Sequence, residues 1–502
     1  MLMHRRLPLV LMLVTAACGA GCERRAEAPR VTAKMRIGIG LPPKGTPGTG
    51  PEAIIRLLAN DSWLTNKPDG HQAERIATGW EWDQARTTLR LKLRRDVYFH
   101  DGTLLTPELA AQALREAART DGNRLTSIAS VTPVGEDAVD IKLKERNSFI
   151  LPDLTGVFVL KPGDPAMGTG PFQIVRADPK TGVTLLGAFP QYFRGRPDLA
   201  EVEVASYPTQ RNAWVAMMRG DIDMLHEVSR EAVEFVKAES TVKSYQFPRP
   251  YYIPLVFSVR HPILKNPEVR KAINEAFDRA ALVRDAMNGQ GRPAEGPVWP
   301  LHFAYSASTQ RFAFDPASAR RRLDNAGLRV HTTGSGASTR FSFTCLVFAG
   351  DARFERLAVL AQKQLADVGI DMKLQPLPLQ ALATRLKSGD FEAFLFEFAG
   401  RSLSWVYEMW RSHDGSRNNS GYKSADAALD RIRGARSDDE VRQGVSELSA
   451  VLHEDPPAAF LVWQTTARAV SLKFDVRAEE DRDIFANPWQ WRPAGALTQA
   501  AR

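Results

Sequence analysis

Short stretches in which apolar and polar residues alternate recur along the chain. Alternation with a period of two is typical of a half-buried β-strand. It predicts strands at residues 35–40, 87–93, 201–208 and 370–377. Residues 131–144 contain two such stretches in succession and therefore predict a β-hairpin. Strands are expected from the beginning of the chain to its last third.

Helical periodicity occupies the intervals between these strands, and it predicts helices at residues 107–119, 212–219 and 354–369. Gly220 is expected to end the second of them, because glycine adopts left-handed φ at little cost. Asn266 and Pro267 predict the start of a further helix, since asparagine caps free N–H groups and proline needs no donor there. Asp278 predicts a cap for the helix that follows. Helices that separate the strands indicate the α/β class.

The composition narrows the classes of protein that need to be considered. A chain of 502 residues is longer than a single hydrophobic core usually supports, so two or more lobes are expected. With 44% hydrophobic and 25% charged residues, it has the composition of a soluble globular protein. The net charge is +8, but Lys and Arg are scattered among Asp and Glu. No nucleic-acid partner is therefore predicted.

The amino-terminal residues have the pattern of an export signal. A basic start is followed by an apolar run from Leu7 to Val14 and then by small residues, and the run is too short to span a bilayer. The sequence "VTAAC", which ends at Cys18, resembles a bacterial lipobox, with Cys22 as the alternative lipidated residue. Residues 1–18 are thus a predicted signal peptide and residues 19–34 a flexible tether. The protein is expected on the extracytoplasmic face of the membrane or in the periplasm, held by a lipid anchor.

One segment, "VYFHDGTLLTPE", contains a possible catalytic or metal-binding cluster of His100, Asp101 and Glu108. Each residue also has a local structural explanation. Asp101 and the following glycine predict a tight turn, while Thr106 and Pro107 predict a capped helix start that Glu108 complements. A metal site would need further ligands, and no HxxxH, HExxH or paired cysteine supplies them. The structural interpretation is preferred.

The remaining motifs give no catalytic centre. "MGTGPFQIV", residues 167–175, lacks the pattern of a phosphate-binding loop and predicts a turn that enters a strand. Residues 412–422 repeat His-Asp-Gly but have the composition of a polar surface loop. Cys345 lies in an apolar run and is expected to be a buried, inert thiol. No catalytic residue, metal ligand or cofactor is predicted, so the protein is not expected to be an enzyme; scattered His, Asp and Ser leave a secreted hydrolase as the alternative.

Several motifs resemble a known family when they are taken in their order along the chain. They are "RIATGWEWD", "FHDGT", "MGTGPFQIV", "MRGDIDM", "PEVRKAINEAFDRAALVRD" and "SGDFEAFLFEF". Together they resemble the bacterial extracellular solute-binding proteins of family 5, the peptide and nickel receptors of ABC importers. The resemblance covers most of the mature chain.

The resemblance implies a periplasmic-binding-protein type II-like α/β fold, with two lobes joined by a hinge and an extra mixed lobe inserted early. The corresponding bounds are 35–60, 168–262 and 478–502 for lobe I, 61–167 for the inserted lobe II, and 263–477 for lobe III. It also implies a monomer that captures a small solute in an interlobe cleft and delivers it to the permease and ATPase subunits of an ABC transporter. A receptor-like sensor that does not transport is a further alternative.

Departures from the family pattern bear on the solute. Peptide-binding members carry an acidic residue that anchors the peptide ammonium, and the expected acidic positions here fall near Arg401 and Ser404. The family's asparagine after an earlier strand is Ser258. A guanidinium repels a cation and favours an anion, which predicts an anionic or neutral solute with an apolar part. The alternative is that Arg401 faces solvent and another acid is the anchor.

Four aromatic residues are candidates for stacking on the solute. They lie near the expected cleft and are Tyr251, Tyr252, Trp299 and Trp405. Core packing is the alternative role for each of them.

Overall fold

The computed structural model describes residues 33–40, 50–120, 125–306, 311–332, 338–413 and 418–495. The predicted leader, Cys18 and Cys22 lie outside these residues. All the elements below belong to one compact unit that begins at Ala33. Within the described ranges, no helix is both long enough and apolar enough to cross a membrane.

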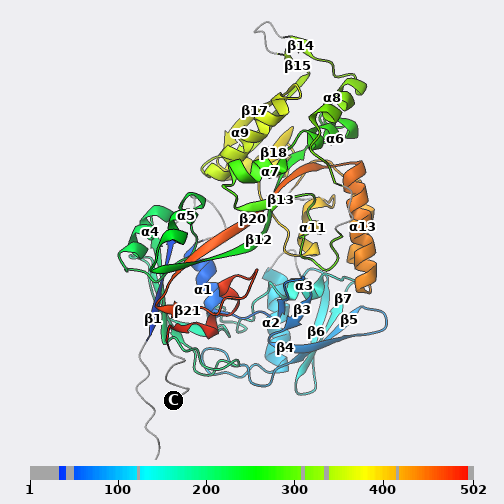
Figure 1. Cartoon of the computed structure of the whole chain (residues 1–502). Coiled ribbons are helices and arrows are strands. Elements are labelled where there is room, and N and C mark those ends of the chain that lie inside the picture. Colours follow the sequence, from blue (N-terminus) through cyan, green and yellow to red (C-terminus); the bar gives the residue numbers. More distant parts are fainter. Residues whose placement is uncertain are drawn as a thin grey trace, which may run out of the picture. The chain divides into compact units, whose positions relative to one another are not determined.

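Two long antiparallel strands connect the parts of the main sheet (Figure 1). They are β12 (Val242–Phe257) and β20 (Ala458–Ser471), and they pair from Val242 opposite Ser471 to Val256 opposite Ala458. The pairing is irregular between Pro248 and Tyr252. Proline lacks the N–H that a ladder needs, so Pro248 and Pro250 favour this irregularity. The sheet order is β17-β16-β18-β12-β20-β11-β1-β10-β9-β8.

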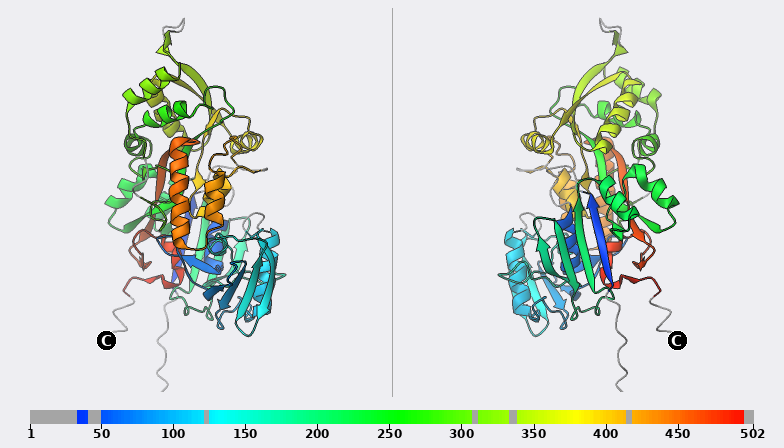
Figure 2. Two further views of the ribbon diagram at one scale, coloured as in Figure 1. Left: turned by 90° about the vertical axis from the view of Figure 1, so that its right-hand side faces the viewer. Right: turned by 90° about the vertical axis from the view of Figure 1, so that its left-hand side faces the viewer.

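The first part of the sheet lies on one side of this strand pair, and the right-hand view of Figure 2 shows β1 in dark blue beside blue-green strands. Its strands are β1 (Lys34–Gly40), β8 (Phe172–Asp178), β9 (Val183–Ala188), β10 (Glu201–Tyr207) and β11 (Met224–Leu225). Its helices and small elements are α1 (Pro51–Ala59), α4 (Gln210–Met218), η1 (Arg230–Ala232), α5 (Val233–Ala238), β21 (Phe474–Asp475), η3 (Ile484–Ala486), η4 (Pro488–Gln490) and β22 (Arg492–Pro493). Two hydrophobic clusters hold it together, one of them around Met35, Ile37 and Trp491.

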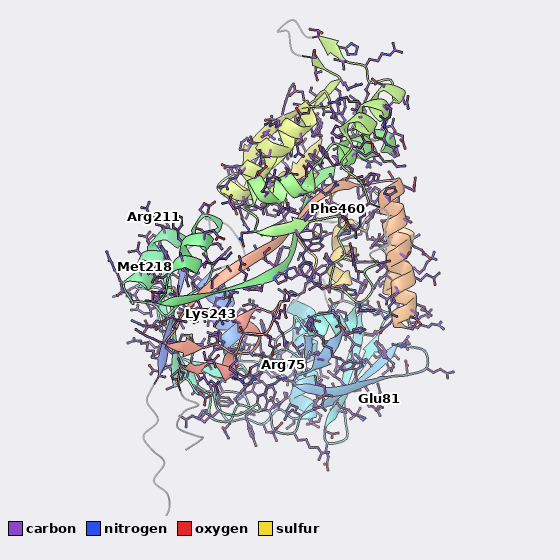
Figure 3. All side chains as sticks on the ribbon, in the orientation of Figure 1. Arg75, Glu81, Arg211, Met218, Lys243 and Phe460 are labelled. Atoms are coloured by element: carbon purple, nitrogen blue, oxygen red, sulfur yellow. The ribbon has the colours of Figure 1, made fainter. Side chains whose placement is uncertain are left out.

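Residues 61–167, called the inserted segment here, form a four-stranded sheet with the order β4-β5-β7-β6. Their own hydrophobic cluster extends from Trp63 to Val159. The elements are β2 (Leu64–Asn66), β3 (Gln72–Glu74), β4 (Ala77–Trp82), β5 (Thr88–Leu93), α2 (Pro107–Thr120), β6 (Ile128–Val134), β7 (Ala138–Leu143) and α3 (Ile150–Leu154). Arg75, labelled in Figure 3, donates to the buried carboxylate of Asp61.

The third part contains the largest hydrophobic cluster, which includes Phe460 of β20 (Figure 3). Its strands are β13 (Gly291–Pro293), β14 (His331–Thr332), β15 (Ser338–Thr339), β16 (Phe341–Phe348), β17 (Ile370–Leu377), β18 (Ala393–Leu395) and β19 (Phe398–Ala399). Its helices are α6 (Pro267–Glu275), α7 (Arg279–Ala281), the π-helical η2 (Leu282–Ala286), α8 (Pro316–Asn325), α9 (Ala352–Ala366), α10 (Leu379–Ser388), α11 (Leu403–Trp410), α12 (Asp426–Arg433) and α13 (Asp438–Glu454).

The predicted strands and helices are confirmed, within a few residues at their ends. Asn266 and Asp278 both cap helices as expected, through hydrogen bonds from Glu268 N and Ala281 N. The helix after Asp278 differs from the expectation, because only three residues are α-helical before the π-helical turn. Cys345 is buried in β16, and burial raises the pKa of its thiol.

The "VYFHDGT" segment has the structural roles that its sequence predicts. His100 Nε2 lies 3.1 Å from the carbonyl oxygen of Gly170. Lys161 donates to Asp101 and lowers the pKa of that carboxyl to about 2. Gly102 has a φ of 84°, which a tight turn requires and glycine adopts readily, and helix α2 begins at Pro107. His100 and Asp101, which first suggested a chemical site, instead stabilise the turn and its contacts with neighbouring segments.

The glycines of "MGTG" are required by close packing. A Cβ on Gly168 would lie 2.2 Å from the carbonyl oxygen of Ala59, and one on Gly170 would lie 2.4 Å from the Ala59 carbonyl carbon. No side chain fits at these distances. This motif therefore packs the start of β8 against the end of α1.

His71 joins the inserted segment to the third part of the fold. Its Nδ1 lies 2.9 Å from Asp69 Oδ2, and its Nε2 lies 3.0 Å from Asp438 Oδ2 at the start of α13. The imidazole stacks on Phe303 with 4.0 Å between the ring centroids. Burial by itself lowers the pKa of His71, but the hydrogen bonds to Asp69 and Asp438 outweigh it and raise the pKa.

We expect this contact to depend on pH. A histidine with a raised pKa in the folded state stabilises fully below its unfolded-state pKa of about 6.5, and the contribution is lost as the pH rises through the folded-state value. The substitution His71→Phe keeps the ring on Phe303 but removes the charge. It should lower the free energy of unfolding by about 0.5 kcal/mol more at pH 5.5 than at pH 8.5, a small effect because the pair is part-exposed.

Denaturant unfolding at the two pH values measures this difference. Asp438→Asn should also make the free energy of unfolding depend less on pH, because it removes one of the two carboxylates that raise the pKa of His71. An effect of His71→Phe that is equal at both pH values would contradict the interpretation.

Candidate ligand-binding site

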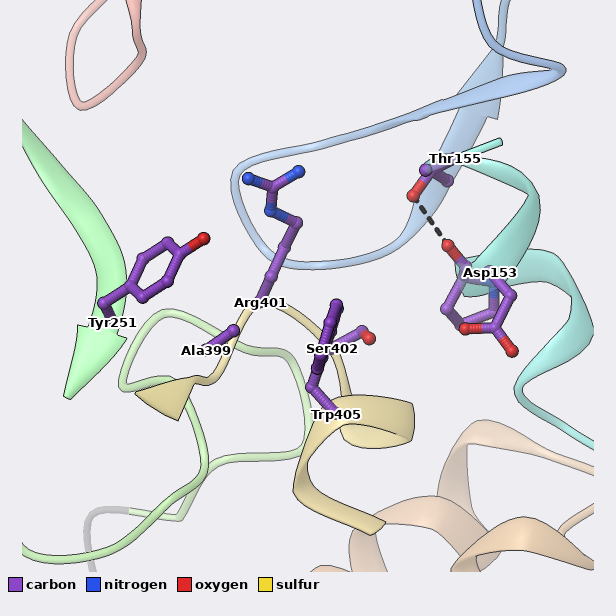
Figure 4. Close-up of a pocket in the computed structure, with 9 residues that line it drawn as sticks. Asp153, Thr155, Tyr251, Ala399, Arg401, Ser402 and Trp405 are labelled. Carbon is purple, nitrogen blue, oxygen red and sulfur yellow. Dashed lines mark hydrogen bonds between the residues drawn. The ribbon is translucent and has the colours of Figure 1, made fainter. Parts of the chain in front are cut away.

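A pocket of about 80 Å³ lies where the inserted segment faces β12 and the β19–α11 connection (Figure 4). One wall comes from α3 and the residues after it. The other comes from Tyr251 and from the start of α11. The lining residues are Pro152, Asp153, Thr155, Gly156, Tyr251, Ala399, Arg401, Ser402 and Trp405. Three of the seven residues predicted from the sequence, Tyr251, Arg401 and Trp405, line it together.

Arg401 supplies the positive charge of the pocket. It follows β19 directly, and Figure 4 shows its side chain extending past Tyr251 toward the ribbon of the inserted segment. The residue is exposed. Within the described part of the chain, no hydrogen bond or ion pair joins its guanidinium to another residue. A guanidinium with five donors and no acceptor is suited to binding an anionic group.

Two aromatic side chains flank this charge. Tyr251 is half-buried, and the guanidinium carbon of Arg249 lies 4.2 Å from the centroid of its ring. Trp405, in the first turn of α11, is also half-buried. Half-buried rings offer apolar area at low conformational cost and can stack on a planar or apolar group. The pocket thus combines an anion-binding group with apolar walls.

Ser404 lies beneath the pocket rather than in its lining. Its hydroxyl donates to Asp153 Oδ1 over 2.7 Å, and the Ser402 and Ser404 hydroxyls are 2.8 Å apart. Asp153 and Ser404 are only 7% and 9% exposed. These hydrogen bonds connect the inserted segment to the connection that carries Arg401.

Tyr252, Ser258 and Trp299 lie outside this lining. Successive residues of a strand point to opposite faces, so Tyr252 enters the core where Tyr251 enters the pocket. Trp410 Nε1 donates to the Tyr252 hydroxyl over 2.8 Å, and burial raises the pKa of that phenol. Trp299 packs edge-on against Trp463, with 5.0 Å between centroids. Ser258 is buried just after β12, where its N–H donates to the carbonyl of Glu392.

A largely buried acid, Glu397, precedes Arg401 by four residues. Glu397 accepts a hydrogen bond of 2.6 Å from Gln464, and its oxygens lie 3.5 Å from the guanidinium of Arg249 and 3.8 Å from that of Arg353. Burial alone would raise the pKa of Glu397, but the two arginines outweigh it and lower the pKa. This carboxylate is compensated by two internal cations.

The sequence analysis did not name six of the nine lining residues, among them Asp153, Thr155 and Ser402. Asp153 and Thr155 belong to the inserted segment, and Asp153 is 251 positions from Ser404 along the chain. No periodicity or motif connects such distant positions. Ser402 was within reach, because it directly follows the candidate Arg401 in the sequence.

Comparison with known proteins places the chain in a family. Residues 72–420, well over half of the chain, match the model of the bacterial extracellular solute-binding proteins, family 5 Middle. The chain belongs to this family. The resemblance of the motifs is thereby confirmed. The members are solute-binding receptors.

Relatives agree with the assignment. The chain is 25% identical over 440 residues to the oligopeptide-binding protein AppA of Bacillus subtilis (strain 168). The aligned region covers 79% of this chain and 79% of AppA. The structure of that AppA with a nonapeptide superposes with a TM-score of 0.75 at 21% identity, over 92% of this chain and 99% of the other. NikZ of Campylobacter jejuni in complex with Ni(L-His) gives a TM-score of 0.77 at 17% identity, over 92% and 100%. The type II periplasmic-binding-protein fold is confirmed for this family member.

Neighbouring tyrosines should respond differently to loss of their hydroxyl groups. Tyr252→Phe leaves the buried Trp410 Nε1–H without its acceptor, which should lower the free energy of unfolding by about 1–3 kcal/mol. Tyr251→Phe is the matched control, and its effect should stay within about 0.5 kcal/mol because the ring is part-exposed. Denaturant unfolding measures both. Equal losses in the two variants would contradict the placement of these side chains.

Proposed function

We propose that this family member is an extracytoplasmic receptor that captures a small solute between its lobes and delivers it to an ABC importer permease. Family membership supports this role, and relatives carry names for cargo as different as oligopeptides and a nickel–histidine complex. The proposed lobes are those given by the sequence analysis. Binding closes them around the solute and excludes water.

The proposal includes a membrane anchor. Residues 1–18 are the proposed leader, and Cys18, or else Cys22, is the proposed lipidated residue that holds a monomeric receptor beside its permease. Anchoring raises the effective concentration of the loaded receptor at the permease. The motif "VTAAC" supports this part of the proposal.

The proposed solute is anionic or neutral with an apolar part, and the unpaired guanidinium of Arg401 carries this proposal. Tyr251 and Trp405 supply apolar walls around it. Two acids lie nearby: Glu397 is compensated by Arg249 and Arg353, and Asp153 in the pocket lining accepts a hydrogen bond from the Ser404 hydroxyl. A free-amine peptide would therefore place its positive charge beside an unpaired cation, which disfavours it.

A matched pair of probes tests the charge preference. Phenylpropanoate and phenylpropylamine share an apolar part and differ in charge, so isothermal titration with each measures the effect of the charge. The wild type should bind the acid more tightly. Arg401→Gln should weaken acid binding about tenfold, which corresponds to about 1.4 kcal/mol. Arg401→Asp should reverse the preference.

Free tetra-alanine serves as the competing probe. Tetra-alanine that binds more tightly than the acid, with an affinity unchanged in Arg401→Gln, would refute the proposed solute class. Incubation with the methyl ester of phenylpropanoate, followed by mass spectrometry, provides a second measurement, because a receptor leaves the ester intact whereas a hydrolase releases the acid.

A further inference from the structure

The hydroxyl groups of Ser402 and Ser404 each donate their proton to one identifiable acceptor. Ser404 donates its single proton to Asp153 Oδ1. Ser404 cannot also donate to Ser402, so the 2.8 Å contact between these two hydroxyls is made by the Ser402 proton. Both protons are therefore used inside the protein, in the order Ser402 to Ser404 to Asp153.

The position of Ser402 in the chain supports this arrangement. Ser402 is the N-cap residue of α11, where a serine oxygen ordinarily accepts a hydrogen bond from the first turn of the helix. No such side-chain bond forms here. The hydroxyl instead faces Ser404, while its oxygen borders the pocket. What Ser402 can offer a solute is a lone pair.

Thr155 repeats the same pattern on the opposite wall. Its hydroxyl donates to the carbonyl oxygen of Pro152 over 2.6 Å and accepts from Asn66 Nδ2 over 2.9 Å. The Thr155 proton is thus also used internally (Figure 4). A second hydroxyl that lines the pocket can only accept.

The donors lie on the other side. Arg401 can only donate, and Figure 4 places its side chain and the Tyr251 hydroxyl on the side of the pocket away from Asp153 and Thr155. The pocket therefore has one side on which Arg401 can only donate and Tyr251 can donate or accept, and an opposite side on which Asp153, Thr155 and Ser402 can only accept.

We propose that this pocket selects a solute that carries both an anionic group, bound by Arg401, and an O–H or N–H donor, bound by Ser402 and Thr155. This inference rests on the proposed function and adds a second requirement to it. An anion without a donor would remove water from the acceptor side and return no hydrogen bond, which is costly in a closed site. Asp153 is the positioning residue, because its carboxylate fixes the proton direction through Ser404.

Phenyllactate and its O-methyl ether are the probes, since they share the carboxylate and the ring and differ in one donor. Isothermal titration should show that the wild type binds phenyllactate about tenfold more tightly than the ether. Equal affinities would overturn the inference.

Asp153→Asn tests the positioning role with little change in shape. An asparagine amide can donate to Ser404, which turns the Ser404 proton toward Ser402 and releases the Ser402 proton into the pocket. The tenfold preference should then fall to about twofold or less, while carboxylate binding at Arg401 is retained. Ser404→Ala should give the same loss, because it also frees the Ser402 proton. Asp371→Asn, on the exposed face of β17, is the matched control and should keep the preference.

The outcomes separate the inference from the function on which it rests. A tenfold preference that survives in both Asp153→Asn and Ser404→Ala, together with acid binding that is lost in Arg401→Gln, overturns the inference alone. Failure of the wild type to bind either phenyllactate or phenylpropanoate overturns the proposed solute class and the inference together. Circular dichroism and unfolding curves establish that each variant is folded before titration.

Discussion

The antiparallel pairing of β12 with β20 is the interaction on which the rest of the structure depends. The two strands carry the sheet from the part that contains β1 to the part that contains β16. Their ladder is broken where Pro248 and Pro250 withhold N–H groups. A break in a ladder bends a strand and redirects its side chains. Beside this break, Tyr251 enters the pocket while Tyr252 enters the core.

Charge compensation decides which ionic groups remain available to a solute. Glu397 is enclosed by Arg249, Arg353 and Gln464, so its negative charge is already balanced. Arg401 lies nearby and has no described partner. Burial of a charge is tolerated when it is paired, whereas an unpaired charge beside a pocket remains ready for a ligand. The available positive charge at the site follows from this difference between two residues on either side of β19.

Much of the local structure could be predicted from short-range patterns. Residues 370–377 alternate over most of their length and form β17 with the same bounds. Asn266 and Asp278 cap helices as their sequence contexts indicate. Hydrophobic periodicity did not predict strand β12, because three prolines interrupt its pattern and a buried strand lacks alternation. The family resemblance implied only a strand that ends before Ser258. Arg401 was found through its departure from a family pattern. The proton direction at Ser402 could not be found, since it depends on a carboxylate far away in the sequence.

The sequence by itself determined the α/β class, the family, most helices and strands, and the exchange of an acidic residue for Arg401. These features depend on periodicity, capping and residue order, which act over a few positions. Only the tertiary structure decided that Asp153 and Thr155 share a pocket with Arg401 and that Tyr252 does not. The physical reason is that packing of the inserted segment against α11 brings together groups 251 positions apart, and no local pattern records that contact.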